Sequence, residues 1–100
     1  MRVRLLAAAR ADIDAAAGWY DAASVGLGDS FRSEVDAVLA RLSARPNVAP
    51  VWLPDARFHC AHLTRFPYTV FLRQHAREWI VVAVTPPATA ARSLEEAQLS

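Results

Sequence analysis

The sequence predicts an α+β fold in which a helix hairpin packs on an antiparallel-rich sheet of four strands. Three observations lead to this prediction: a short alternating segment at the start of the chain, two consecutive amphipathic helices, and three apolar segments after a proline-rich connection. The order strand, helix, helix, strand, strand, strand excludes a doubly wound nucleotide-binding fold, because that fold alternates strands with helices.

The first segment predicts one strand followed by one helix. Val3 and Leu5 alternate with arginines, which is the period-two pattern of a short strand. From Ala9 to about Ala23 every third or fourth residue is apolar and the charged residues lie off that stripe, which indicates an amphipathic helix. The stripe consists of Ala9, Ile13, Ala16 and Tyr20.

A glycine-containing turn and a second helix follow. The two glycines within residues 25–30 end the first helix, and Asp29 or Ser30 is expected to cap the next one. The second helix has an apolar stripe from Phe31 to Leu42, and Pro46 lies just beyond its end. Three large aromatic side chains are expected to pack between the helices and the sheet. They are Trp19, Tyr20 and Phe31.

The second half of the chain predicts three strands. Residues 46–56 contain three prolines and are expected to form a connecting loop. Strands are expected over residues 57–64, 66–73 and 79–84, and residues 74–78 are expected to form a polar hairpin loop. The last strand is apolar at every position, which is typical of a central strand covered on both faces.

Length and composition predict one domain, residues 1–100, with a divergent tail over residues 85–100. In that tail Ser93 and Glu96 stand at capping-box spacing and predict a short final helix. No apolar run reaches the ~18 residues of a membrane span and the N-terminus lacks a signal-peptide core, so we expect a cytoplasmic protein without membrane contact. A net charge of only +1 argues against nucleic-acid binding by bulk charge alone.

Four segments together carry a family resemblance. Residues 9–20 place an acidic residue before an apolar one and end in the pair Trp19-Tyr20, and residues 26–35 span the interhelical turn. Residues 65–71 read RFPYTVF, and residues 80–84 form the apolar final strand. In this order, over residues 9–84, they resemble the RelE/ParE superfamily of toxins from bacterial type II toxin–antitoxin pairs, and ParE-like members most closely.

The resemblance implies a toxin that inhibits growth and is neutralised by a cognate antitoxin protein. Its ParE-like branch implies inhibition of DNA gyrase through protein contact, whereas its RelE-like branch implies a ribosome-dependent messenger-RNA endonuclease with an aromatic or histidine-bearing C-terminal tail. No His, Tyr, Trp or Lys follows Val84, and Arg92 is the one basic residue there. The sequence therefore favours a gyrase inhibitor over an enzyme. The endonuclease and a non-toxic interaction protein of the same fold remain alternatives.

Binding residues are expected in the meander of the three predicted strands and their connecting loops. Their arginines can form a basic surface for RNA phosphates or for an acidic partner. Arg65 and Arg73 are expected on one strand face because they are eight residues apart, an even spacing. Tyr68 lies in the most specific of the resembling segments. The candidate contacts to the target or the antitoxin are Arg57, Arg65, Tyr68, Arg73 and Arg77.

We expect no cofactor and no metal. His59, Cys60 and His62 are close in sequence, but strand alternation leaves Cys60 and His62 on one face and His59 on the other. Two ligands do not close a zinc site. The interhelical glycines lack the context of a dinucleotide-binding loop, the chain has no P-loop lysine, and its single cysteine excludes an internal disulfide.

Overall fold

A computed structural model describes residues 1–99. The predicted α+β order, including the helix hairpin and the short C-terminal helix, is confirmed. The elements along the chain are β1 (Arg2–Leu5), α1 (Ala7–Ala23), α2 (Leu27–Ala44), the 3₁₀ helix η1 (Pro46–Val48), β2 (His59–His62), β3 (Thr69–His75), β4 (Glu78–Thr85), the 3₁₀ helix η2 (Pro87–Thr89) and α3 (Ala90–Leu99).

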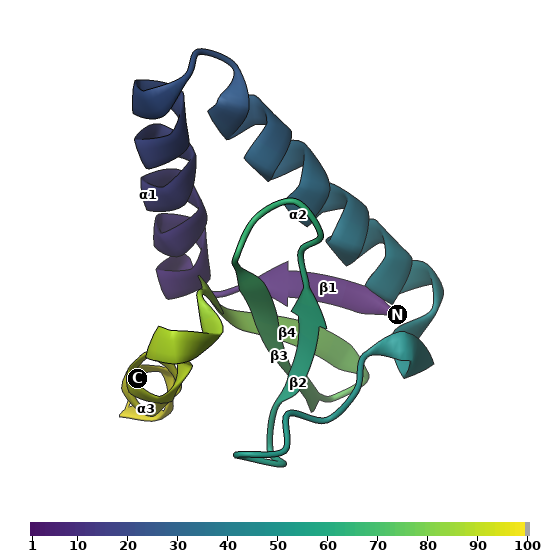
Figure 1. Cartoon of the computed structure of the whole chain (residues 1–100). Helices are drawn as coiled ribbons and strands as arrows, with labels where there is room; N and C mark the ends of the chain where they lie inside the picture. The colour runs from purple at the N-terminus through teal and green to yellow at the C-terminus, as the bar shows by residue number, and fades with distance from the viewer. Residues whose placement is uncertain (100) are drawn as a thin grey trace.

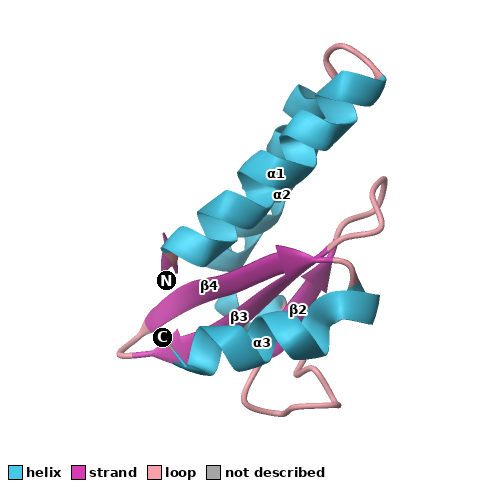
Figure 2. Cartoon of the chain, turned by 90° about the vertical axis from the view of Figure 1, so that its left-hand side faces the viewer, coloured by secondary structure: helices cyan, strands magenta, loops and turns pink. Residues whose placement is uncertain are grey.

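The four strands form one mixed sheet in the order β1-β4-β3-β2. β1 runs parallel to β4, while β2, β3 and β4 form an antiparallel meander. α1 and α2 diverge from their connecting loop and cover one face of the sheet (Figure 1), and α3 lies across the opposite face (Figure 2). In the described part of the chain, no helix is long and apolar enough to cross a membrane.

Strand β4 is the centre of the fold. Seven of its eight residues are buried, as its uninterrupted apolar sequence predicts. Val81 and Val84 pack toward the helix hairpin with Phe31 and other residues of both helices. Ile80 and Val82 pack toward α3 on the other face. The register shifts so that Val82 has no partner on β3, which marks a β-bulge in this strand.

Gly26 and Gly28 permit the sharp connection between α1 and α2, in different ways. Gly26 has a φ of 89°, a backbone conformation that favours glycine. A Cβ on Gly28 would lie 2.4 Å from the carbonyl oxygen of Ala17, so the helices approach too closely there for any side chain. α2 thus begins before the predicted caps Asp29 and Ser30, and that prediction was wrong.

The first turn of α2 is capped from the other helix. The Gly28 N–H donates a 2.7 Å hydrogen bond to the Asp21 carboxylate of α1. Because the first N–H groups of a helix lack partners within it, this carboxylate satisfies one of them and favourably faces the positive end of the helix dipole. Sequence spacing could not reveal this cap, since Asp21 is seven residues away and lies on another helix.

Two other boundaries differ from prediction. β3 begins at Thr69 instead of residue 66, because the chain turns at Pro67 and the Leu63 N–H bonds to the Tyr68 carbonyl across that turn. α3 begins at Ala90, so Ser93 lies inside the helix and the predicted capping box does not form. Thr89 stands at the helix entrance instead, with its hydroxyl bonded to Thr85 at 2.6 Å.

The β3–β4 connection is tighter than the predicted loop over residues 74–78. His75 pairs with Glu78, which leaves only Ala76 and Arg77 in the turn, both with positive φ (49° and 62°). This is the geometry of a two-residue hairpin of type I′, which favours Asn and Gly because a Cβ is strained in the left-handed region.

A substitution that relieves the backbone strain of this turn should make the protein more stable. We expect Ala76→Asn to raise the free energy of unfolding by up to about 1 kcal/mol, because asparagine tolerates this backbone conformation better than alanine. Urea denaturation monitored by circular dichroism measures the change. The matched control is Ala22→Asn at an exposed position of α1, which should lower stability slightly. Equal or lower stability of Ala76→Asn would contradict the strained turn.

Candidate functional site

An apolar groove lies between α1 and the outgoing end of β4. Its volume is about 500 Å³ and it is open to solvent. Its walls come from one face of α1, the turn that precedes β3, and the last residues of β4 with the proline that follows. The lining residues are Asp12, Ala15, Ala16, Trp19, Tyr20, Pro67, Tyr68, Val84, Thr85 and Pro86.

The sequence of α1 explains why the groove exists. Asp12, Ala16 and Trp19 are four and three residues apart, so they follow one another along one face of the helix. The small side chains of Ala15 and Ala16 leave a depression, and the Trp19 ring stands at its edge. The helix therefore contributes both the space and a large apolar wall.

Trp19 is exposed over 67% of its surface. The prediction that it packs between helices and sheet was therefore wrong, whereas Phe31 is fully buried as expected. Trp19 makes an edge contact with Tyr20, with ring centroids 5.1 Å apart. Its helical spacing resembles that of a core residue, and only the arrangement of neighbouring elements shows that most of its surface is left uncovered by the described residues.

A cluster of four aromatic rings supports the groove from beneath. Tyr20 lies 4.8 Å from Phe66 and 5.6 Å from Phe31, measured between ring centroids. Tyr68 completes the cluster at 5.1 Å from Phe31. Burial and the neighbouring Tyr68 raise the pKa of Tyr20, so its phenol stays protonated. Contacts between aromatic rings hold this wall in place.

Asp12 is the charged residue of the groove, and it connects α1 to β4. Its carboxylate accepts a 3.0 Å hydrogen bond from the Val84 N–H. Burial raises the pKa of Asp12, this hydrogen bond partly opposes the rise, and the negative charge of Glu96 adds to it. The side chain thus satisfies a backbone donor where the end of β4 leaves the sheet, at the cost of a partly buried charge.

Replacement of Asp12 separates these two effects. Asp12→Ala leaves the Val84 N–H without its acceptor and should lower the free energy of unfolding by about 1–3 kcal/mol. Asp12→Asn keeps an acceptor and removes the buried charge, so its stability should stay close to that of the wild type. Urea denaturation of both variants measures the difference. Equal destabilisation by alanine and asparagine would show that the hydrogen bond is unimportant.

Arg65 is held by α2 and does not join a basic cluster. The Glu34 carboxylate of α2 accepts hydrogen bonds from the backbone N–H and hydroxyl of Thr64 and from the backbone N–H and Nε of Arg65. Two of the segments that carry the family resemblance therefore meet at this contact. Burial disfavours the charged form of Glu34, but these hydrogen bonds outweigh it and lower its pKa.

The lowered pKa of Glu34 predicts a pH dependence. The hydrogen bonds of the folded state stabilise the charged form of Glu34. Glu34 therefore stabilises the fold fully above its ordinary pKa of 4.5, and this contribution is lost as pH falls through the lower pKa of the folded state. Glu34→Gln should therefore lower stability by about 1–2 kcal/mol near neutral pH and by much less near pH 3.

Chemical denaturation at both pH values measures this difference. Arg65→Ala is the control, because that side chain is 63% exposed and its ion pair with Glu34 should contribute less than about 1 kcal/mol. A deficit of Glu34→Gln that is the same at both pH values would contradict a role for the ionised carboxylate.

Arg57 and Arg65 lie apart from each other and from Arg73 and Arg77. Arg57 precedes β2 in a turn, where Asp55 binds its guanidinium through two hydrogen bonds of 2.9 and 2.6 Å. Arg73 lies on β3 and Arg77 in the following turn. Arg65 precedes β3, so the prediction that Arg65 and Arg73 share a strand face was wrong. The structure brings only Tyr68 of the five predicted residues into the groove.

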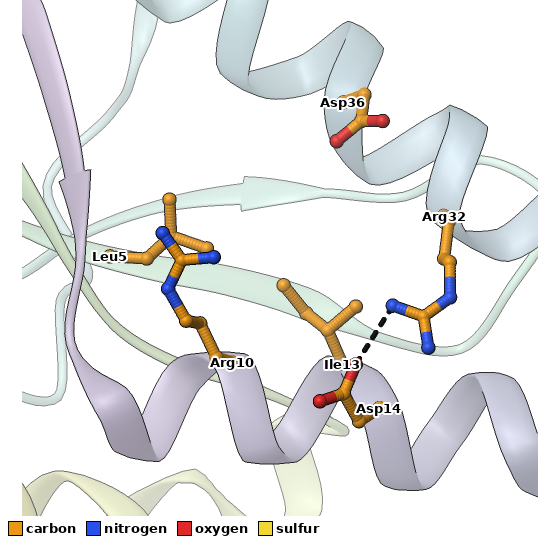
Figure 3. A pocket seen from close by; sticks show the side chains of 6 residues that line it. All are labelled: Leu5, Arg10, Ile13, Asp14, Arg32 and Asp36. Atoms are coloured by element: carbon orange, nitrogen blue, oxygen red, sulfur yellow. Dashed lines mark hydrogen bonds and ion pairs between the residues drawn. The ribbon is translucent and has the colours of Figure 1, made fainter.

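A second, more polar cleft of about 210 Å³ opens between α1 and α2. Figure 3 shows Asp14 and Arg32 facing each other from the two helices, joined by a 2.8 Å ion pair. Both side chains are well exposed, so this pair contributes little to stability. Leu5 and Ile13 supply the apolar part of the wall. The ion pair spans the cleft and leaves less apolar surface than the groove offers.

The histidine and cysteine side chains of β2 point as predicted. The His59 ring contacts Trp79 on the face of the helix hairpin, with centroids 4.9 Å apart, whereas Cys60 packs into the core under α3. Burial raises the pKa of the Cys60 thiol, so it is not an activated nucleophile. Among residues 1–99, no group of three or more His, Cys, Asp or Glu side chains is placed to hold a metal ion.

Comparison with known proteins gives a structural likeness. No protein-family model matches the sequence. A search of curated proteins also finds no match. A solved structure described as "Chromosomal ParDE TA system from P. aeruginosa" contains a chain that superimposes with a TM-score of 0.70 at 17% sequence identity, covering 86% of this chain and 95% of that chain. The protein therefore has the fold of that chain, an α+β arrangement like the one predicted from the sequence.

Proposed function

We propose that this protein is the toxin of a bacterial type II toxin–antitoxin pair and that a segment of the antitoxin occupies the groove beside Trp19. The observation that carries the proposal is the 67% exposure of this tryptophan beside a 500 Å³ apolar groove, on a fold shared with a chain of a ParDE system. A large exposed aromatic residue next to a depression is a typical anchor for a protein partner.

The groove favours one kind of partner segment. Its walls are mainly alanine, proline and aromatic side chains, with Asp12 as their one charged member. An amphipathic helix or extended segment with apolar side chains on one side fits such a surface. Asp12 already accepts the Val84 N–H, so the segment gains affinity chiefly from apolar contact with Trp19 and the adjacent rings.

We also propose that the cellular target is DNA gyrase, inhibited by protein contact. This part rests on the resemblance of residues 9–84 to ParE-like members of the superfamily. Inhibition by contact requires surface complementarity and no catalytic group, so it does not require the predicted arginines to form one site. The RelE-like alternative predicts cleavage of translated messenger RNA in the presence of ribosomes.

Controlled expression in a bacterium tests the proposal. We expect growth arrest with filamentation and induction of the DNA-damage response, relieved by co-expression of the antitoxin from the neighbouring gene. Trp19→Ala should remain toxic but escape neutralisation, because loss of an aromatic anchor costs about 2 kcal/mol or more, which is roughly thirtyfold in Kd. Purified proteins and titration calorimetry measure that change directly.

The matched control is Leu53→Ala. Leu53 is also apolar and 89% exposed, but it lies outside the groove, so its truncation should leave neutralisation intact. Absence of any growth defect would refute the toxin assignment. Toxicity with cleaved messenger RNA and no DNA damage would replace gyrase by the ribosome. Full neutralisation of Trp19→Ala would place the antitoxin elsewhere.

A further inference from the structure

Arginines from β1, β3 and the hairpin turn gather at the end of the sheet opposite the groove. β1 pairs with the start of β4, and the end of β3 pairs with the same segment. The register therefore places Arg4, Ile80 and Arg73 in one row across three strands, and Arg2, Glu78 and His75 in the next. Arg77 follows in the turn. We call the set of Arg2, Arg4, Arg73, His75, Arg77 and Glu78 the basic sheet end.

The side chains of these rows lie on the face that α3 partly covers. Val3 and Leu5 pack toward the helix hairpin, so the alternating Arg2 and Arg4 project to the other face. Ile80 packs with the core under α3, and Arg73, its register partner, projects to the same side. Neighbouring strands are about 4.8 Å apart, which separates Arg4 from Arg73 by about 10 Å.

Glu78 lies between Arg2 and Arg4, and one oxygen of its carboxylate is buried. Its Oε2 atom is 3.4 Å from Nε of Arg2 and 3.9 Å from Nε of Arg4. That oxygen is buried, whereas the Arg2 and Arg4 side chains are 78% and 49% exposed. One oxygen of Glu78 is therefore covered, its side chain is only 23% exposed, and the two guanidinium groups reach solvent.

The basic sheet end carries more positive charge than the whole protein. It contains four of the eleven arginines and one of the ten carboxylates, which gives +3 locally against +1 for the chain. Net composition conceals this patch because the remaining surface is slightly acidic. A local field of one sign attracts an anionic partner even when the net charge is small.

The chemistry of the patch favours phosphates over a protein partner. Among the side chains whose exposure is described, the exposed large apolar ones are Trp19, Val25, Val48, Val51 and Leu53, and none belongs to the basic sheet end. A protein interface normally needs such an anchor at its centre. Arginine instead binds phosphate oxygens in a bidentate manner without apolar contact.

We propose that the basic sheet end binds the phosphodiester backbone of duplex nucleic acid. A duplex fits better than a single strand, because the patch contains no Trp, Tyr or Phe on which unstacked bases could lie, and the exposed imidazole of His75 is its one aromatic ring. The contacts are made to phosphates, so the recognition is independent of sequence. DNA and RNA share this chemistry. This binding does not depend on the proposed toxin function, since the groove and the patch are at opposite ends of β4.

Fluorescence anisotropy with a labelled DNA duplex and an RNA duplex of the same sequence tests the proposal. With three or four phosphate contacts, the logarithm of the binding constant should fall against the logarithm of salt concentration with a slope of about −3. Arg4→Ala/Arg73→Ala should reduce that slope by about 2 and weaken binding roughly tenfold at low salt. Preference for one duplex identifies the better ligand, and equal binding shows that the patch recognises only the phosphate backbone that both share.

Two control variants distinguish an effect of the basic sheet end from a general loss of positive charge and from unfolding of the protein. Arg10→Ala/Arg92→Ala removes the same charge from exposed positions elsewhere and should leave the slope nearly unchanged. Arg77→Gly removes one charge while relieving the positive φ of the turn, so it should lower the slope by about 1 without loss of thermal stability. This variant keeps the test valid if Arg4→Ala/Arg73→Ala unfolds.

Three results would overturn the proposal. The first is no measurable binding of either duplex at low salt. The second is equal weakening by Arg4→Ala/Arg73→Ala and Arg10→Ala/Arg92→Ala, which would indicate attraction by net charge alone. The third is tighter binding of polyglutamate than of either duplex at matched charge, with sensitivity to Arg77→Gly, which would indicate an acidic protein as the partner.

Discussion

Burial of β4 on both faces is the constraint on which the rest of the structure depends. A strand with apolar side chains on both sides must be covered twice, and this chain uses the α1–α2 hairpin on one face and α3 on the other. β1 and β3 pair with its two edges and satisfy its backbone groups. The helix hairpin, the edge strands and the C-terminal helix are thus all arranged around one strand.

The apolar groove and the basic sheet end lie at the two ends of β4. At its outgoing end, Val84 donates to Asp12 and brings α1 beside the strand, which opens the apolar groove under Trp19. At its beginning, Glu78 lies between Arg2 and Arg4, and β3 adds Arg73 from the other side. An apolar surface and a basic surface therefore occupy opposite ends of one strand, and different partners can contact them independently.

Polar contacts between distant segments fix the positions of the two helices and of the turn before β3 relative to one another. Glu34 of α2 binds Thr64 and Arg65, and Asp21 of α1 caps α2 through the Gly28 N–H. Each carboxylate accepts hydrogen bonds from backbone N–H groups of another segment. These contacts hold the turn before β3 against the helix hairpin, and that turn supplies Tyr68 to the groove. The shape of the groove thus depends on residues outside it.

The sequence by itself determined the class of fold, the helix hairpin, the central strand and the faces of His59 and Cys60, because periodicity along one element reports which side is buried. It misplaced Trp19, the helix caps and Arg65. Those depend on contacts between elements. Trp19 stands at the helical spacing of a core residue, but it is 67% exposed. Asp21 caps a helix other than its own, and Arg65 lies before β3 begins. Only the tertiary structure joined Arg2 and Arg4 to Arg73, since parallel pairing of β1 with β4 leaves no local signal in the chain.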